Sequence, residues 1–434
     1  MDFYFKRAIT SSSITSGHLS SRFYPRGFVF DHASASFFVS SKLNLFNILG
    51  LMNSNTFEYI VDCINPTINT GSEVMEKIPF IRHTLFKSKI KNLSQNNISF
   101  AKADWDSFET SWDFKTHPFL THIAEHKQNW TLESAYDQWE KEALDRFNHL
   151  KANEEELNRI FIDLYSLQDE LTPEEEDKDV SVRKADKEKD VKSFLSYFIG
   201  CVFGRYSLDT PGLAYAGGEW DSTKYQTFVP NQDNVILLTD ADYFHDQRDI
   251  INRLKEFLIA TFGKNSLYKN LDFIGSVLDQ NKFDKGFESQ QIIRDYFLND
   301  FYKKDHLKIY QKRPIYWELN SGKAKGFKAL FYVHRYDADT MAMIRSGYLH
   351  ELQDAYENTL QMRLGQLDNE TDKKIVKKLD KEINNLKKQI TEVVKFDQDL
   401  QHIASQAIKI DLDDGVIVNH SKVQADSRIL TPIK

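Results

Sequence analysis

Residues 309–350 read IYQKRPIYWELNSGKAKGFKALFYVHRYDADTMAMIRSGYLH, and this stretch decides how we interpret the fold. β-branched and aromatic residues flank a short turn that contains glycine, which is the pattern of a β-hairpin. The pattern predicts strands over residues 314–318 and 327–334, joined by a turn at 321–323. A helix should then begin near Asp339, whose carboxylate can cap the first turn.

The same stretch is basic, although the whole chain has a formal net charge of −8. Its cations, which alternate with aromatic residues, are Lys323, Lys325, Lys328, Arg335 and Arg345. A net-acidic protein that binds nucleic acid must do so through a local basic face. We therefore predict that these five side chains contact the DNA backbone. The alternatives are that they are merely solvated, or that the stretch is core or a protein interface.

Length and composition set broad limits on the chain. Its 434 residues suggest two to four domains with a substantial core. Cys63 and Cys201 have no CxxC spacing, so neither a disulfide framework nor a thiolate zinc site is expected. The apolar run 43–52 is too short to span a bilayer, and we expect no membrane association and a cytoplasmic location.

The first forty residues have the pattern of short strands around a Ser/Thr-rich loop at 10–21. His18, Arg22 and Arg26 lie near the end of this loop, where hydroxyl and guanidinium groups can reach phosphates and base edges. We predict that Arg22 and Arg26 contact DNA, with a solvated hairpin loop as the alternative. An amphipathic helix is expected over 43–64.

The middle of the chain is mostly helical by pattern. Aromatic residues are dense over 103–139 and are assigned to a core or a domain junction rather than to base stacking. Residues 131–171 predict two helices or a hairpin, and the charged run 172–192 predicts an exposed linker. A strand is expected at 234–239 within a second α/β segment.

Apolar residues return at helical spacing after Asp339, and a breaker at 365–374 divides them into two arms. The expected structure is an antiparallel, coiled-coil-like helical hairpin that acts as a spacer between two working parts. The predicted class is α+β, with α/β target-recognition segments alternating with long helical spacers. The predicted domains are a partial target-recognition domain (1–102), a helical connector with a charged linker (103–192), a second α/β domain (193–338), a helical hairpin (339–409) and a C-terminal tail (410–434).

Several long strings carry a resemblance to a known family: DWDSFETSWDFKTHPFL (104–120), EEELNRIFIDLYSLQDELTPEEE (154–176), SFLSYFIGCVFGRYSLDTPGLAYAGGEWD (193–221), QKRPIYWELNSGKAKGFKALFYVHRYDADT (311–340) and IDLDDGVIVNH (410–420). In this order they resemble the C-terminal region of the PglX family, the adenine-specific DNA methyltransferases of BREX phage-defence systems. The resemblance implies a full-length enzyme that transfers a methyl group from S-adenosylmethionine to adenine N6 at a defined DNA site. It also implies that this chain is a target-recognition region, with double-stranded DNA and a methyltransferase catalytic domain as partners.

The catalytic motif of that chemistry does not occur in the sequence. An adenine methyltransferase holds the flipped base with a [DNS]PP[YFW] tetrapeptide, and the nearest string, NPTI at 65–68, lacks the second proline and the aromatic ring. We therefore expect no catalytic residue and no cofactor site in this chain, and no enzyme activity from the chain alone. The alternative function is a scaffold that binds other BREX proteins or a phage inhibitor.

One motif has metal-ligand spacing. His122, Glu125 and His126 match an HxxEH pattern. No third ligand is evident in the sequence, so we interpret the two histidines as a surface or junction pair and predict no metal site.

Overall fold

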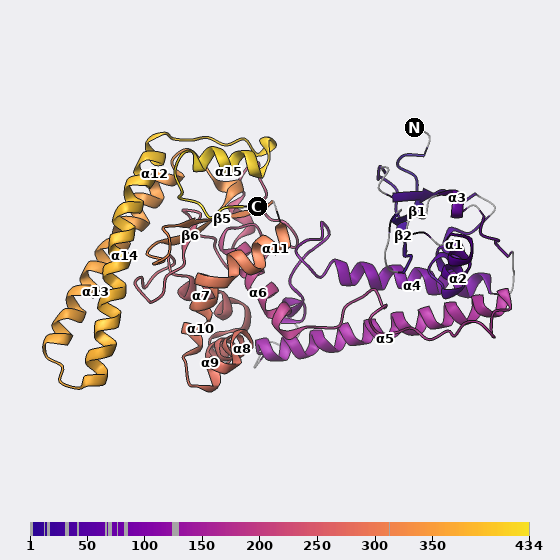
Figure 1. Ribbon diagram of the computed structural model, residues 1–434, viewed down its shortest axis with the longest axis horizontal. Helices are drawn as coiled ribbons and strands as arrows, with labels where there is room; N and C mark the ends of the chain where they lie inside the picture. The colour runs from indigo at the N-terminus through magenta and orange to yellow at the C-terminus, as the bar shows by residue number, and fades with distance from the viewer. Residues whose placement is uncertain are drawn as a thin grey trace. The chain divides into compact units, whose positions relative to one another are not determined.

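The computed structural model describes residues 3–12, 14, 18–30, 34–40, 43–65, 67, 72–75, 77–81, 86–123, 130–311 and 313–433. They form an α+β protein, as predicted, with two compact units. The N-terminal unit comprises residues 1–106 and 139–185, and the C-terminal unit comprises 107–138 and 186–434 (Figure 1). No described helix is long and apolar enough to cross a membrane.

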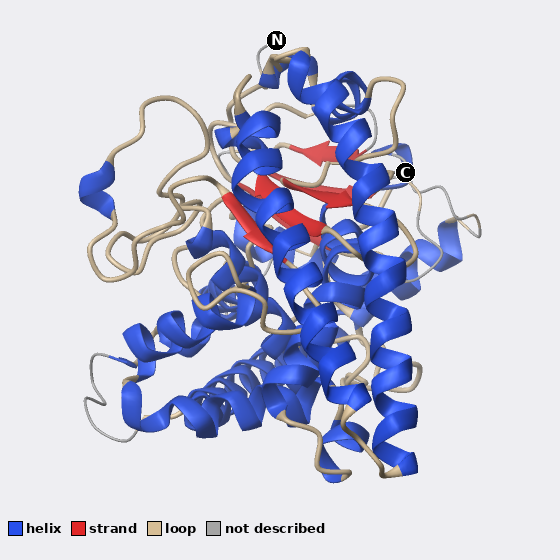
Figure 2. Cartoon of the chain, turned by 90° about the vertical axis from the view of Figure 1, so that its left-hand side faces the viewer, coloured by secondary structure: helices blue, strands red, loops and turns tan. Residues whose placement is uncertain are grey.

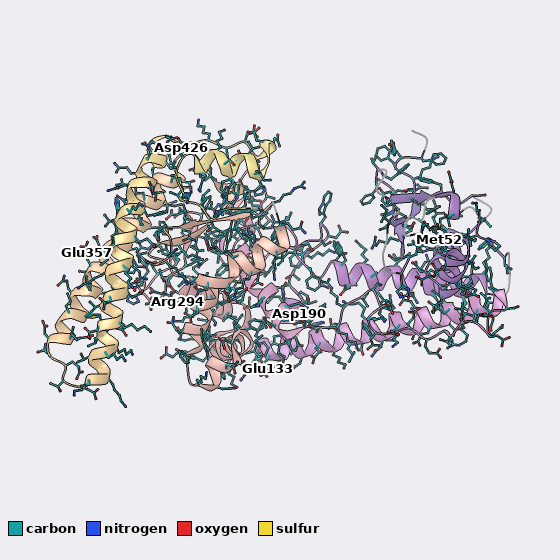
Figure 3. The ribbon with its side chains drawn as sticks, in the orientation of Figure 1. Met52, Glu133, Asp190, Arg294, Glu357 and Asp426 are labelled. Carbon is teal, nitrogen blue, oxygen red and sulfur yellow. The ribbon has the colours of Figure 1, made fainter. Side chains whose placement is uncertain are left out.

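The N-terminal unit packs helices against one face of a small antiparallel sheet. Its elements are β1 (Ala8–Ser12), β2 (Ser21–Tyr24), β3 (Ser34–Phe37), α1 (Leu45–Met52), α2 (Asn55–Ile64), α3 (Ser72–Met75), α4 (Lys87–Trp105) and most of α5 (Leu132–Tyr165). The strand order is β2-β1-β3. Ile9 is fully buried and lies opposite Phe23 and Phe37 in the register, so these three side chains share the face that meets the helices. Met52, labelled in Figure 3, belongs to this core.

Two helix predictions in this unit need correction. The expected helix over 43–64 is interrupted, because Ser54 accepts a hydrogen bond from the backbone N–H of Phe57 at 3.3 Å and so starts a second helix. The expected pair of helices in 131–171 is one helix of 34 residues. The segment from Leu132 to Tyr165 contains neither glycine nor proline, so nothing in it breaks the helix.

The C-terminal unit surrounds a second three-stranded antiparallel sheet of order β4-β6-β5. Its strands are β4 (Val235–Leu237), β5 (Tyr316–Asn320) and β6 (Lys328–Tyr332). Its helices are α6 (Lys187–Val202), α7 (Ile250–Phe262), α8 (Leu267–Leu278), α9 (Gln280–Asp284), α10 (Ser289–Tyr296), α11 (Leu307–Tyr310), α12 (Thr340–Ile344), α13 (His350–Asp368), α14 (Lys373–Ser405) and α15 (Val416–Gln424). Figure 2 looks onto this sheet, in red, past two long helices.

The predicted hairpin of strands is confirmed. Strands β5 and β6 pair antiparallel with Trp317 opposite Phe331, and both rings are fully buried. The predicted strand at 234–239 is also present, as β4. The helix after the hairpin begins at Thr340 as expected, but the side chain of Asp339 does not cap it. Asp337 instead accepts a hydrogen bond from the Thr340 hydroxyl at 2.8 Å.

Helices α13 and α14 lie side by side and are joined at one end by residues 369–372 (Figure 1). An ion pair of 3.0 Å between Arg363 and Glu382 links them. The apolar face of α14 carries Leu386, Val393 and Phe396 into the same core as the strands. Helix α14 is therefore one wall of the C-terminal unit, whereas the coiled-coil winding and the spacer role remain predictions.

A carboxylate fixes α14 to the turn between β5 and β6. Glu392 accepts hydrogen bonds from the Ser321 hydroxyl at 2.6 Å and from the backbone N–H groups of Ala324 and Gly326 at 2.7 and 3.0 Å. Gly326 lies so close to the helix that a Cβ there would approach the carbonyl oxygen of Gln389 to 2.8 Å. The turn and the helix are thus held in one arrangement.

The last residues of the chain extend the sheet. The N–H of Asn320 donates to the carbonyl of Ile429 at 2.9 Å, and the N–H of Thr431 donates to the carbonyl of Glu318 at 2.8 Å. Ile429 and Leu430 are buried in the core. The segment predicted as a tail is therefore packed against β5.

Candidate nucleic-acid interface

The outer face of the N-terminal sheet carries polar side chains and an exposed arginine, beside the buried Ala8 and the half-buried Tyr24. Thr10 on β1 lies opposite Arg22 on β2 and opposite Ser36 on β3, so these three residues form one row across the sheet. The row faces away from Ile9 and the helices, because side chains alternate along each strand. Arg22 is exposed. The hydroxyl of Ser36 is buried, so Thr10 and Arg22 are the members of this row that can donate to phosphate oxygens and to base edges.

Three more cations surround this face. Arg26 is exposed in the turn after β2, and Lys6 and Arg7 are exposed immediately before β1. Residues 3–30 contain no Asp or Glu. Among the described residues, none of the arginines at 7, 22 and 26 has an ion-pair partner. Sequence reasoning missed Lys6 and Arg7, although the absence of acidic residues over 3–30 was a signal that could have found them.

Apolar side chains are exposed beside Arg26. Gly27, at φ +98°, donates its N–H to the carbonyl of Phe5 at 3.3 Å, and Phe5 donates in turn to the carbonyl of Phe28 at 2.9 Å. Phe5 is 61% exposed and Phe28 is 50% exposed. Cations next to accessible rings are typical of surfaces that bind single-stranded nucleic acid, in which the rings stack on unpaired bases.

His18 does not add an unpaired positive charge to this face. Its Nδ1 lies 2.7 Å from a carboxylate oxygen of Glu58, and its Nε2 lies 3.6 Å from Asp179. The hydrogen bond and the charge of Glu58 raise the pKa of His18 above its ordinary value. The imidazole of His18 is therefore paired with carboxylates of its own unit.

The five cations predicted around the β5–β6 hairpin do not form one exposed face, and Lys328 requires a correction. This residue is 5% exposed, and its ammonium donates to Glu318 at 3.1 Å and to the carbonyl of Leu298 at 2.8 Å. Burial lowers the pKa of Lys328, and the nearby Glu318 opposes that shift. The strand alternation that the sequence shows places this lysine on an inner face, so it cannot reach a phosphate in this structure.

The two arginines are also used within the unit. Arg335 is half-buried, donates to three backbone carbonyls and stacks over Trp220 with 4.4 Å to the ring centroid. Arg345 makes a bidentate ion pair with Asp397, with hydrogen bonds of 2.8 and 3.0 Å. Lys323 is exposed, whereas Lys325 is half-buried and donates to Asn299. Of this predicted set, Lys323 is best placed to contact DNA, and its role stays a prediction.

A buried polar cluster in the C-terminal unit contains a carboxyl group with a raised pKa. Burial raises the pKa of Glu109 to about 7, against hydrogen bonds from Ser196, Tyr206 and Tyr310 and the charge of Arg205. Such a shift is common at catalytic sites, but it also occurs in structural networks. Protein side chains enclose this carboxyl group, and we interpret the cluster as structural.

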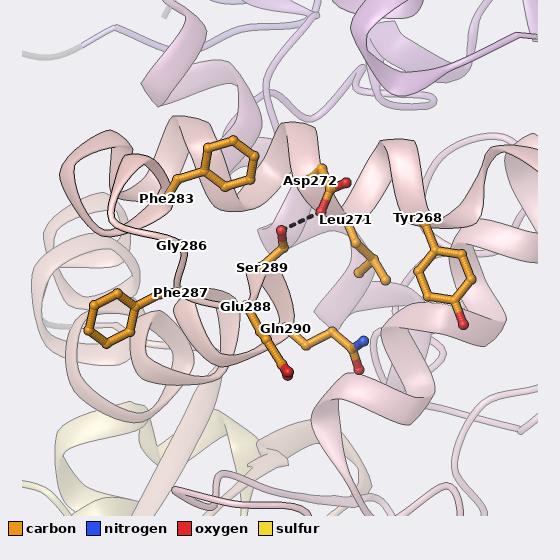
Figure 4. A pocket seen from close by; sticks show the side chains of 9 residues that line it. All are labelled: Tyr268, Leu271, Asp272, Phe283, Gly286, Phe287, Glu288, Ser289 and Gln290. Atoms are coloured by element: carbon orange, nitrogen blue, oxygen red, sulfur yellow. Dashed lines mark hydrogen bonds between the residues drawn. The ribbon is translucent and has the colours of Figure 1, made fainter.

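A shallow pocket of 410 Å³ lies between α8 and α10 (Figure 4). Tyr268 and Phe287 stand at its two ends, and Asp272, which accepts a hydrogen bond from Ser289 at 2.5 Å, and Glu288 supply its negative charge. It has no basic side chain in its lining and no residue suited to hold a phosphate. The pocket is therefore no part of a DNA-binding surface.

The HxxEH motif, at which we predicted no metal site, lies largely outside the described residues. These include His122 but neither Glu125 nor His126. Among the residues that the structure does describe, no group of three His, Cys, Asp or Glu side chains could hold a metal ion. The NPTI string is likewise described only in part.

Comparison with known proteins gives a consistent result. The chain is 53% identical over 432 residues to "Adenine-specific methyltransferase PglX" from Lacticaseibacillus casei (strain Zhang), a match that covers all of the chain and 35% of that protein. It is 32% identical over 460 residues to "Adenine-specific methyltransferase BrxX" from Escherichia coli O9:H4 (strain HS), which covers 99% of the chain and 37% of that protein. No protein-family model matches.

The chain is PglX-like along its whole length. The resemblance seen in the sequence is thus confirmed. This PglX-like chain spans about a third of the length of each of these relatives.

Proposed function

We propose that this PglX-like chain is the DNA target-recognition region of an adenine-N6 DNA methyltransferase in BREX phage defence. It binds duplex DNA and positions a catalytic domain that supplies the [DNS]PP[YFW] motif. The observation that carries the proposal is the group of exposed arginines on and beside the N-terminal sheet, which have no carboxylate partner among the described residues. The two methyltransferase relatives support the choice of DNA as the ligand.

The unpaired arginines fit this role on electrostatic grounds. Each cation that neutralises a phosphate releases counterions, and this release supplies much of the affinity for duplex DNA. Arginine also makes bidentate contacts with guanine in the major groove, so Arg22, which lies opposite Thr10, can contribute to sequence choice. S-adenosylmethionine would be held by the rest of the full-length enzyme, which also supplies the motif that presents the adenine.

The test replaces Arg7, Arg22 and Arg26 together with glutamine and measures duplex binding against salt concentration. We expect the slope of log affinity against log salt to become shallower by about 0.9 for each lost phosphate contact, up to about 2.7. All three side chains are exposed, so the fold should be retained. A matched control replaces exposed lysines of the C-terminal unit, Lys264, Lys269 and Lys285, with glutamine. Equal slopes for the parent chain, the arginine variant and the control would contradict the proposal.

The second candidate is a scaffold that binds other defence proteins or a phage inhibitor. The pocket of Figure 4 favours it, because aromatic walls and two carboxylates suit a lysine or arginine side chain of a protein partner. Replacing Glu288 with Gln and Phe287 with Ser should then weaken capture of BREX proteins by the chain while leaving duplex binding unchanged.

A further inference from the structure

Helix α14 carries an excess of lysine over its first half. Residues 373–388 contain seven lysines and two acidic residues, and all seven lysines are exposed. The lysines are Lys373, Lys374, Lys377, Lys378, Lys381, Lys387 and Lys388. From the sequence alone this excess resembles the solvated surface of any charged helix, because the buried side of the helix is unknown.

The structure defines that side. Leu379, Ile383, Leu386 and Val393 point into the C-terminal unit, so the opposite side of α14 faces solvent. At about 100° per residue, the lysines of the exposed side fall within an arc of about 80°. They are Lys373, Lys377, Lys381, Lys388 and Lys395, and we call them the lysine ridge. With a rise of about 1.5 Å per residue, the ridge is about 33 Å long.

The charges of the ridge are not neutralised within the unit. In the described part of the chain, none of its five members has a carboxylate within ion-pair distance. The nearest pair on this segment joins Lys378, which is outside the ridge, to Glu382 at 3.9 Å, and Glu382 also binds Arg363. By the same count the exposed Asp380 lies about 20° outside the arc of the ridge, and Asp399 follows the ridge on the same side, so the positive run ends after Lys395.

Helix α14, which carries the ridge, is fixed to the rest of the C-terminal unit by side-chain contacts. Glu392 fixes α14 to the β5–β6 turn, and Asp397 of the same helix binds Arg345. Because the helix is already fixed, its backbone needs no ordering when the ridge meets a rigid polyanion, so no binding free energy is lost to backbone entropy.

We propose that the lysine ridge is a second contact for the backbone of duplex DNA, separate from the N-terminal sheet. The inference rests on the proposed function. One turn of B-DNA is about 34–36 Å long, so a straight row of about 33 Å along the duplex spans about one turn and can meet the phosphates where each strand crosses it. Lysine is a point charge without the planar fork that reads guanine, so this contact adds affinity and orientation but no sequence choice. An acidic protein is the competing occupant.

The experiment compares the 434-residue chain with the variant Lys377→Gln, Lys381→Gln and Lys388→Gln. Duplex binding is titrated against salt for two duplexes of unrelated sequence. We expect the salt slope to become shallower by up to about 2.7, and affinity to fall by the same factor for both sequences. The control that changes Lys264, Lys269 and Lys285 carries the same net charge and should keep the parent slope. Far-ultraviolet circular dichroism verifies that α14 is intact.

Two outcomes separate this inference from the function on which it rests. If the ridge variant binds DNA like the parent while the Arg7, Arg22 and Arg26 variant fails, the ridge does not contact DNA and the proposed function stands. If the parent chain shows no salt-dependent binding of duplex DNA, the proposed function is wrong, and the inference that rests on it is wrong too.

Discussion

Replacing Lys328 with methionine should destabilise the C-terminal unit without changing the salt dependence of DNA binding. The side chains of Lys328 and Glu318 are 6% and 1% exposed, and their charged atoms lie 3.1 Å apart. Methionine retains most of the volume of lysine but leaves the carboxylate of Glu318 buried without its cation. Breaking one side of a buried ion pair costs about 3–5 kcal/mol. Thr431 still donates to Glu318 at 2.5 Å, which favours the lower half of that range.

The double variant Glu318→Gln with Lys328→Met isolates the cause of this loss. Glutamine is neutral and keeps an acceptor for the Thr431 hydroxyl, so most of the lost stability should return. Urea unfolding of the C-terminal unit measures both free energies. Lys325→Met is a matched control, because that lysine is half-buried and makes a hydrogen bond rather than a buried ion pair, and its replacement should cost less than about 1.5 kcal/mol.

The reasoning is refuted by a specific pair of results. If Lys328→Met unfolds at the parent urea concentration while its salt slope with duplex DNA becomes shallower by about 0.9, then Lys328 contacts a phosphate and the buried pair is not formed in solution.

Three further predictions concern the rest of the chain. Replacing Leu386 and Ile390 with aspartate should reduce helicity measured by circular dichroism and weaken DNA binding, since each unpaired buried carboxylate costs several kcal/mol; unchanged helicity would show that α14 does not pack through this face. Glu109, with a pKa raised from 4.5 to about 7, binds its proton more tightly in the folded state, so its contribution to stability should decrease as pH rises from about 4.5 to 7, and Glu109→Gln should flatten that part of a melting-temperature profile. Calorimetry of the isolated chain with S-adenosylmethionine should show no stoichiometric binding, and micromolar binding would contradict the absence of a cofactor site.

Local patterns in the sequence determined several elements correctly. The β5–β6 hairpin follows from aromatic strands on both sides of a turn that contains glycine, and the strand at Val235–Leu237 follows from its run of apolar residues. The resemblance to PglX was also carried by local strings, and it is confirmed over the whole chain. Boundaries such as the break at Ser54 depend on a single capping hydrogen bond, which the apolar periodicity around it does not reveal.

The tertiary structure decided which cations remain available. Charge in a sequence is local, but its neutralisation is not: Lys328 is paired across a strand with Glu318, and Arg345 is paired with Asp397, which lies 52 residues further along the chain. The basic stretch that looked most suited to DNA therefore uses much of its charge internally. The arginines at the N-terminal sheet and the lysine ridge of α14 have no carboxylate partner among the described residues. Their elements bury an apolar face against their own units and leave the charged face in solvent.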